Sequence, residues 1–472
     1  TATSTPGSFT ADLAVTLTYG TATKLSVSAS TVSATNRVAF ATQPTVTVQD
    51  VSGNTVDNAT NTISASVTSS NSADVSLGGT TSDSAASGSL AFSNLKLTGT
   101  AASYTITYAS SGLTSTTQTA TLVAGAVDHM SLHASSAGAV DGVAFTTQPI
   151  VKLLDADNNL TTSTSTVSIS VSAGSAAGVA TLGGTYSLAA VAGTATFTNV
   201  KLTGKLDTYT LTYASTGLTS LTQTINVTIG AATQVVLATP AAGFENRANF
   251  TTQPVVEIQD IGGNVVTASS AQIDVAISTG NLTGTLTVNA LNGVADWSTA
   301  ATALGKNGTI GSKTLTFSST GLTDATQTFV LTHGAAYQIA MTSPATLVND
   351  TAFGTQPVVT IQDRDGNTVT TGSDASQAVT LSSNNSDIGG TTSMNANAGV
   401  ANFSNKGVKL TGLVGSRNLT ATIASPNSIV ITNTVTITFG AAAKLAVTTP
   451  SAGAVNDVAF TTQPVVTVQD IS

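Results

Sequence analysis

Four aspartates have the spacing of calcium ligands. They lie in the stretches DADNN (155–159) and DRDGN (363–367), which place side-chain oxygens at alternate positions, as the first half of a calcium loop does. Calcium takes six or more oxygens, usually with a carboxylate further along the loop. These stretches therefore give four calcium candidates: Asp155, Asp157, Asp363 and Asp365.

A hydrogen-bonded turn explains the same residues without a metal. Two matching stretches have Ser52 and Gly262 where the second oxygen ligand would lie, and no Glu occupies the twelfth loop position. In a turn, the first Asp accepts hydrogen bonds from backbone N–H groups just downstream, and Gly or Asn takes positive φ. Under this interpretation the chain binds no cofactor.

The remaining reactive side chains lack the partners that catalysis needs. His129 and His133 would share a strand face about 13 Å apart, because a strand rises about 3.3 Å per residue, so we interpret them as exposed strand residues. No Ser lies in a recurring arrangement with His and an acid, and there is no cysteine. We therefore predict that the protein is not an enzyme.

Composition indicates β-structure and excludes several classes of function. Of the 472 residues, 41% are hydrophobic and only 8% are charged, with a net charge of −9. Thr, Ser, Val and Gly favour strands and turns. There is no Lys/Arg cluster to neutralise phosphates, so we expect no nucleic-acid partner, and no apolar run is long enough to span a membrane.

The string FTTQPVVTVQD and its variants occur five times, with Pro44, Pro149, Pro254, Pro357 and Pro464 spaced by 105, 105, 103 and 107 residues. A repeat of this length has the size of an independent domain. Lysines that could form Lys–Asn crosslinks recur at Lys96, Lys201 and Lys409 but skip the third repeat. The predicted division is 21–125, 126–230, 231–334 and 335–440, with 1–20 as the last strand of a preceding repeat and 441–472 as the first part of a following one.

Each repeat shows the pattern of a two-sheet β-sandwich. In the first, β-rich runs cover 24–29, 45–50, 63–68, 75–77, 89–97, 104–109 and 118–123. Within the recurring string, Val46 and Val48 should face the core and Thr45, Thr47 and Gln49 the solvent. The Pro should precede the strand. Two aromatic positions should anchor the core: Phe40, Phe145, Phe250, Phe353 and Phe460, and then Phe92, Phe197, Trp297 and Phe403.

The stretches VTVQDVSGNTV (46–56), VTIQDRDGNTV (359–369) and GVANF (399–403) resemble bacterial Ig-like domains of the invasin/intimin type. This resemblance implies an all-β fold of tandem immunoglobulin-like sandwiches arranged as an elongated rod, and an extracellular, cell-surface location. It also implies use as a stalk or adhesin.

Three functions follow from this organisation. The first is a structural stalk or spacer of a giant surface protein. The second is a self-assembling surface layer, sheath or filament, in which 1–20 and 441–472 pair with neighbouring copies of the chain. The third is recognition of a glycan or host protein by the most divergent repeat, the third, which carries Trp297 and an apparent insertion at 303–313.

Overall fold

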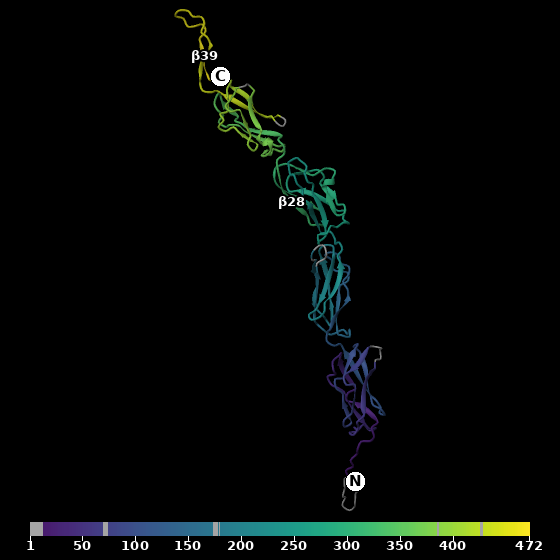
Figure 1. Cartoon of the computed structure of the whole chain (residues 1–472). Coiled ribbons are helices and arrows are strands. Elements are labelled where there is room, and N and C mark those ends of the chain that lie inside the picture. Colours follow the sequence, from purple (N-terminus) through teal and green to yellow (C-terminus); the bar gives the residue numbers. More distant parts are fainter. Residues whose placement is uncertain (1–12, 69–73, 173–177, 179, 385–386, 425–427) are drawn as a thin grey trace, which may run out of the picture. The chain divides into compact units, whose positions relative to one another are not determined.

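The computed structural model describes residues 13–68, 74–172, 178, 180–384, 387–424 and 428–472. These residues form an all-β chain of successive β-sandwiches (Figure 1). The chain divides into two compact units, residues 1–231 with 261–264, and residues 232–260 with 265–472.

The first repeat has the strand order of an immunoglobulin-like sandwich. One sheet has the order β1-β3-β7, the other β2-β10-β9-β4-β6, and β5 pairs with β8. The early strand β2 runs parallel to the last strand β10, while the other pairs are antiparallel. In an immunoglobulin-like sandwich the first, second and fifth core strands form one sheet, and the third, sixth and seventh form the other. Here β1, β3 and β7 are the first set, and β4, β9 and β10 are the second. The strands are β1 (Lys24–Val27), β2 (Thr31–Thr35), β3 (Thr45–Gln49), β4 (Thr62–Thr68), β5 (Val75–Gly78), β6 (Ser82–Ser84), β7 (Ser89–Ala91), β8 (Lys96–Gly99), β9 (Ser103–Ala109) and β10 (Thr116–Val123).

The second repeat follows the same plan, with sheets β11-β12-β16, β15-β13-β18-β19 and β14-β17. A register shift between Leu132 and Ala134 interrupts the alternation that was expected to place His129 and His133 on one face. The strands are β11 (His129–Ala134), β12 (Ile150–Leu154), β13 (Thr166–Ser172), β14 (Thr181–Gly183), β15 (Ser187–Ala189), β16 (Thr194–Thr196), β17 (Lys201–Thr203), β18 (Thr208–Ala214) and β19 (Leu221–Asn226).

The third and fourth repeats each add one short 3₁₀ helix to this plan. The third has β20 (Gln234–Thr239), β21 (Val255–Gln259), β22 (Gln272–Ile277), β23 (Asn281–Thr283), β24 (Thr287–Asn289), β25 (Val294–Asp296), η1 (Trp297–Thr299), β26 (Gly305–Asn307), β27 (Gly311–Ser318) and β28 (Ala325–Leu331). The fourth has β29 (Gln338–Thr342), β30 (Thr346–Val348), β31 (Val358–Gln362), η2 (Ser373–Ser376), β32 (Ala378–Ser383), β33 (Ile388–Gly389), β34 (Ser393–Asn395), β35 (Val400–Asn402), β36 (Lys409–Leu410), β37 (Gly415–Ile423) and β38 (Ile429–Thr438). After them, β39 (Lys444–Thr449) pairs with β40 (Val465–Gln469).

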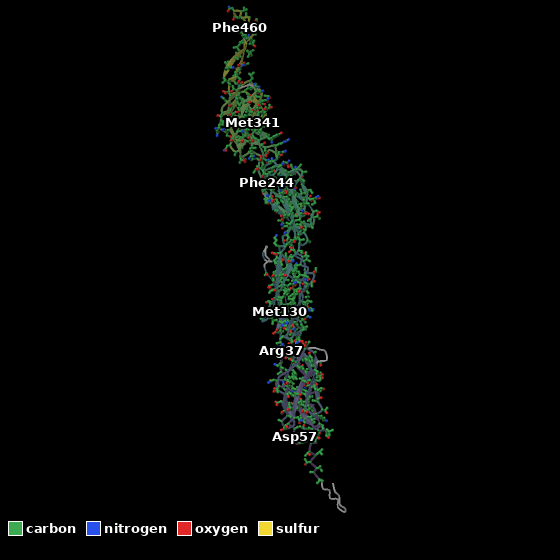
Figure 2. All side chains as sticks on the ribbon, turned by 45° about the vertical axis from the view of Figure 1, so that its right-hand side comes forward. Arg37, Asp57, Met130, Phe244, Met341 and Phe460 are labelled. Carbon is green, nitrogen blue, oxygen red and sulfur yellow. The ribbon has the colours of Figure 1, made fainter. Side chains whose placement is uncertain are left out.

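The expected alternation of the recurring string is confirmed. Val46 and Val48 are fully buried, and the strand begins directly after the Pro in each copy. The aromatic anchors are buried in four separate hydrophobic clusters, except Phe460 on the β39–β40 pair, which is 42% exposed (Figure 2). Gln43 of the TQP stretch joins the segment before β3 to the segment before β8. Its Nε2 donates to Phe40 O and Leu95 O, and its Oε1 accepts Leu95 N. Gln148, Gln253 and Gln356 make the same contacts.

Several expected element boundaries are wrong. The run 89–97 is two strands, β7 and β8, because Asn94 takes a positive φ of 53° between them. Strands β2 and β6 were not expected. The residues of β6 are all polar and exposed, whereas β2 does alternate, with Val32 and Ala34 between polar residues, and was missed. Within 1–20, the described residues 13–20 form no strand, since no described strand pairs with them, and residues 1–12 lie outside the described part. The apparent insertion 303–313 contains β26, so it belongs to the sandwich.

The third repeat places a lysine in a leucine position of the core. Lys306 lies opposite Leu282 in the β23–β26 pair, where the other repeats have Leu97, Leu202 and Leu410. Its side chain is fully buried, and its ammonium group bonds the backbone oxygen of Asn307. Burial, and secondarily the nearby Lys313, lower the pKa of Lys306. Among the described residues, the Lys306 ammonium group forms no ion pair with a carboxylate.

Replacing Lys306 with Leu should therefore stabilise the third repeat, by about 1–4 kcal/mol, because a buried charge gives way to an apolar side chain of similar size. The single tryptophan, Trp297, lies in this repeat and reports its unfolding. We expect the urea midpoint followed by tryptophan fluorescence to rise for K306L. An unchanged or lower midpoint would show that the lysine is compensated.

Candidate functional site: the junctions between repeats

In the second and fourth repeats, the aspartate that ends the recurring string lies at the junction with the preceding repeat. Asp155 follows β12, and its Oδ1 accepts the backbone N–H groups of Asp157 and Asn159, both at 2.9 Å. Its Oδ2 accepts the N–H of Gly125 at 2.8 Å and the Nδ2 of Asn36 at 2.9 Å. One oxygen thus closes the turn, and the other holds the linker and the first repeat.

A charged pair lies beside this contact in the first unit. Arg37 donates from Nε to Asp157 Oδ2 and from a terminal nitrogen to Oδ1, both at 2.7 Å, and so forms the two-point pairing that suits a guanidinium and a carboxylate. Asn36 also donates to Asp157 Oδ2 at 2.7 Å. Figure 2 labels Arg37 at the end of the first repeat next to the second.

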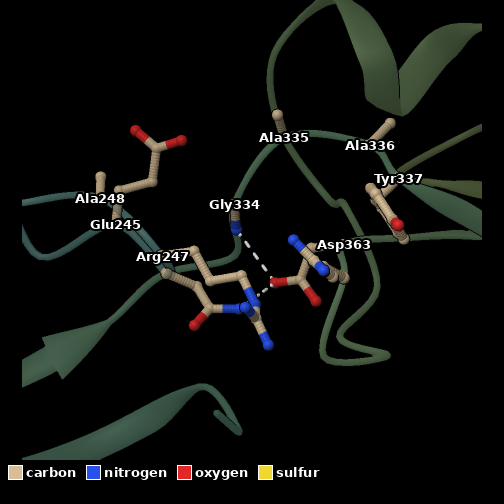
Figure 3. A pocket seen from close by; sticks show the side chains of 10 residues that line it. Glu245, Arg247, Ala248, Gly334, Ala335, Ala336, Tyr337 and Asp363 are labelled. Carbon is tan, nitrogen blue, oxygen red and sulfur yellow. Dashed lines mark hydrogen bonds between the residues drawn. The ribbon is translucent and has the colours of Figure 1, made fainter. Parts of the chain in front are cut away.

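The second unit repeats this arrangement between the third and fourth repeats. Asp363 Oδ2 accepts Gly334 N at 3.1 Å and Asn246 Nδ2 at 2.7 Å (Figure 3). Arg247 pairs with Asp365 at 2.8 and 2.5 Å. The same four residue types in the same roles therefore hold two different junctions.

The turn asparagine completes each junction from the opposite side. Asn159 Nδ2 donates to Gly99 O at 2.9 Å, and its Oδ1 accepts Ala101 N. Asn367 makes the matching bonds to Gly308 O and Ile310 N. Each turn therefore contacts both the linker and a loop of the preceding sandwich.

Close backbone approach explains the recurring linker glycine. A Cβ on Gly125 would lie 2.8 Å from Asn36 O, and one on Gly334 would lie 2.6 Å from Asn246 O. Both distances are shorter than carbon–oxygen contacts allow. A side chain at this position would separate the linker from the asparagine that holds it.

The Arg–Asp pair depends on two sequence positions whose residues differ from junction to junction. Arg37 and Arg247 face Asp157 and Asp365, whereas the matching positions 142 and 262 are both glycine. At the next junction the matching positions hold Asp350 and Ser472, and Asp350 instead bonds Lys409 of its own repeat at 2.6 Å. There Asp470 still accepts Gly440 N and Asn349 Nδ2. The aspartate contact recurs, and the ion pair is an addition.

These contacts shift the acidity of the aspartates. Burial raises the pKa of Asp155, but the hydrogen bonds from Gly125, Asn159 and Asn36 outweigh it and hold the pKa well below its usual range. Asp363 follows the same balance, and its pKa is lowered. The bond from Arg247 is the main cause that lowers the pKa of Asp365 to about 2.

Acid should therefore loosen the junctions. The folded pKa values lie below the ordinary value of 3.8, so the unfolded state binds more protons as the pH falls. The stability that the ionised junction aspartates contribute to the folded state is fully present above about pH 4 and is lost toward pH 2. Thermal unfolding followed by circular dichroism should show a falling midpoint in this window. D363N should flatten the dependence, whereas D324N, at an exposed site, should not; equal slopes for all three proteins would refute the assignment.

The structure places the four calcium candidates in two pairs, one at each of these junctions. Their oxygens already accept hydrogen bonds from Asn, Arg and backbone groups, a donor set that does not suit a cation. Among the described residues, no group of three or more His, Cys, Asp or Glu could hold a metal. Calcium binding stays a prediction of the sequence that this geometry does not favour.

The residues missed from the sequence are Asn36, Arg37, Asn246 and Arg247. Their partners lie 117–121 residues away, so local patterns give no indication of the pairing. A signal did exist, because TNRVAF (35–40) and ENRANF (245–250) each occur in the repeat before one whose recurring string ends in DAD (155–157) or DRD (363–365).

No family model and no curated protein sequence matches the chain. Solved structures that match the chain include the bacterial integrin-binding protein invasin (14% identity, 90% of this chain and 80% of that chain, TM-score 0.25). The human desmocollin-1 ectodomain is 10% identical over 88% and 79%, with a TM-score of 0.31. The Escherichia coli adhesin FdeC is 14% identical over 67% and 99%, with a TM-score of 0.26. The immunoglobulin-like fold rests on the strand order.

Proposed function

We propose that the chain is a non-enzymatic stalk of a large extracellular surface protein, in which tandem sandwiches act as a semi-rigid spacer. The observation that carries this proposal is the aspartate junction. A linker glycine and an asparagine of the preceding repeat both bond the junction aspartate, Asp155 or Asp363, so no free linker separates the sandwiches at these two junctions. Such junctions restrict bending, which is what a spacer requires.

The outward faces of the larger sheets support the same role. In the first repeat, Thr105, Thr107, Thr117 and Thr119 lie on neighbouring strands and face solvent. Uncharged hydroxyl side chains bind water and leave no large apolar patch, as suits a solvated spacer. No helix in the described part of the chain is long and apolar enough to cross a membrane.

Sedimentation velocity separates this proposal from self-assembly into a layer, sheath or filament. A stalk should sediment as one slowly moving monomer whose coefficient does not grow with concentration. Species that grow with concentration would contradict the spacer role and favour contacts between copies of the chain.

A further inference from the structure

A cavity of about 250 Å³ lies at the junction between the third and fourth repeats. Its walls include Glu245, the linker Gly334–Tyr337, and Arg364. Figure 3 shows Glu245 on one side of the linker and Tyr337 on the other. The cavity therefore has charged and aromatic groups at its rim and the small, exposed side chain of Ala335 between them.

The rim residues are special to this junction. The backbone N–H of Tyr337 bonds the oxygen of Gln362, the last residue of β31. The residues that make the matching backbone bond in the other repeats are not aromatic: Thr23, Asp128, Thr233 and Ala443. Arg364 comes directly after the junction aspartate, where the other repeats have an apolar residue: Val51, Ala156, Ile261 and Ile471. Before the junction asparagine, Glu245 replaces Thr35 and Val348. Three changes at one place indicate a function that the other junctions do not share.

Arg364 is positioned for an anion. Its guanidinium carbon lies 5.1 Å from the centre of the Tyr337 ring, a cation–π contact that orients the group and leaves its N–H edges open. Within the described chain it forms no ion pair. A planar guanidinium held in this way binds a carboxylate through two parallel hydrogen bonds.

Glu245 adds a second requirement. Its carboxylate is exposed on the other side of the linker and has no ion pair in the described residues. It would repel a simple anion but accept hydrogen bonds from hydroxyl groups. A ligand must therefore present an acid group to Arg364 and hydroxyl donors to Glu245.

We propose that this cavity binds a carboxylated sugar residue of an acidic polysaccharide. The carboxylate bonds Arg364, the hydroxyls bond Glu245, and the apolar face of the sugar ring lies against Ala335. An extended peptide fits less well, because three of the four linker N–H groups that could pair with it are occupied. Gly334 N bonds Asp363, Ala336 N bonds Asp374, and Tyr337 N bonds Gln362. The proposal does not depend on the spacer role.

Titration calorimetry with the full chain tests the proposal. The probes are glucuronate-, galacturonate- and mannuronate-containing oligosaccharides, the same oligosaccharides with their carboxyl groups reduced to alcohols, and an oligoglutamate peptide. At least one acidic oligosaccharide should bind, and its reduced form should bind at least tenfold more weakly. R364Q and Y337A should each lose at least tenfold in affinity, whereas R417Q, outside the cavity, should not.

Three results would overturn the proposal. They are no binding of any acidic oligosaccharide at millimolar concentration, equal binding of the reduced forms, and equal affinity of R364Q and the wild type. Tighter binding of oligoglutamate would assign the cavity to acidic peptides instead. Thermal unfolding of each variant, followed by circular dichroism, verifies that the fourth repeat, which contains Tyr337 and Arg364, is folded.

Discussion

Replacing Asp363 with Ala should detach the linker between the third and fourth repeats. The change removes the acceptor for Gly334 N, Asn246 Nδ2 and the backbone N–H groups of Asp365 and Asn367. Hydrogen bonds to a charged acceptor contribute about 1.5–3 kcal/mol each, and the donors left behind lie in a buried corner. We expect a local loss of about 3 kcal/mol or more.

Amide hydrogen exchange measures this loss directly. Since 1.4 kcal/mol corresponds to a factor of ten, exchange at Gly334 and in the turn after β31 should quicken on the order of 100-fold. D155A should do the same at Gly125, in the first unit. D324A is the matched control, since it removes an exposed carboxylate that makes no such contacts. Slow exchange at Gly334 in D363A would show that the carboxylate does not hold the linker.

Replacing Trp297 with Ala should have the largest effect on the third repeat. The indole is fully buried, lies 5.5 Å from the Phe317 ring centre, and donates from Nε1 to Thr285 O at 2.9 Å. Truncating a buried Trp costs about 3–5 kcal/mol, from lost contacts and the cavity that remains. For a domain of this size, calorimetry should show one transition lowered by more than about 12 °C.

The control for this change is W297F. Phe92, Phe197 and Phe403 fill the matching core positions in the other repeats, so a phenyl ring fits the site. We expect W297F to lose less than half of what W297A loses, mainly through the missing hydrogen bond. Equal losses for the two variants, or a small loss for W297A, would show that the ring does not anchor the core.

The sequence predicts the inside of each sandwich well and the junctions poorly, for a physical reason. Burial of every second residue in a strand leaves a local pattern, and Val46, Val48 and the phenylalanines follow it. The short strand β6 lies at a sheet edge, and its exposed residues leave no such pattern. Lys306 contradicts the pattern, because its neighbours bury a charge where the other repeats bury leucine.

The junctions could not be read locally because their partners belong to different repeats. Asp155 alone resembles a calcium ligand or a turn cap, and only Asn36 and Gly125 show that it holds two sandwiches together. Comparing repeats with one another recovers part of this information. Arg37 with Asp157 and Arg247 with Asp365 change together along the chain, as residues in contact do.

Small-angle X-ray scattering of the full chain tests the central claim, that hydrogen-bonded junctions make the tandem sandwiches a semi-rigid spacer. Each repeat should be roughly 35–45 Å long, from strands of about six residues with their loops. Four repeats should then give a maximum dimension on the order of 150 Å or more, together with the scattering of a rod, and D155A/D363A should shorten the average dimension. A compact particle, or a wild type as flexible as the double variant, would contradict the account.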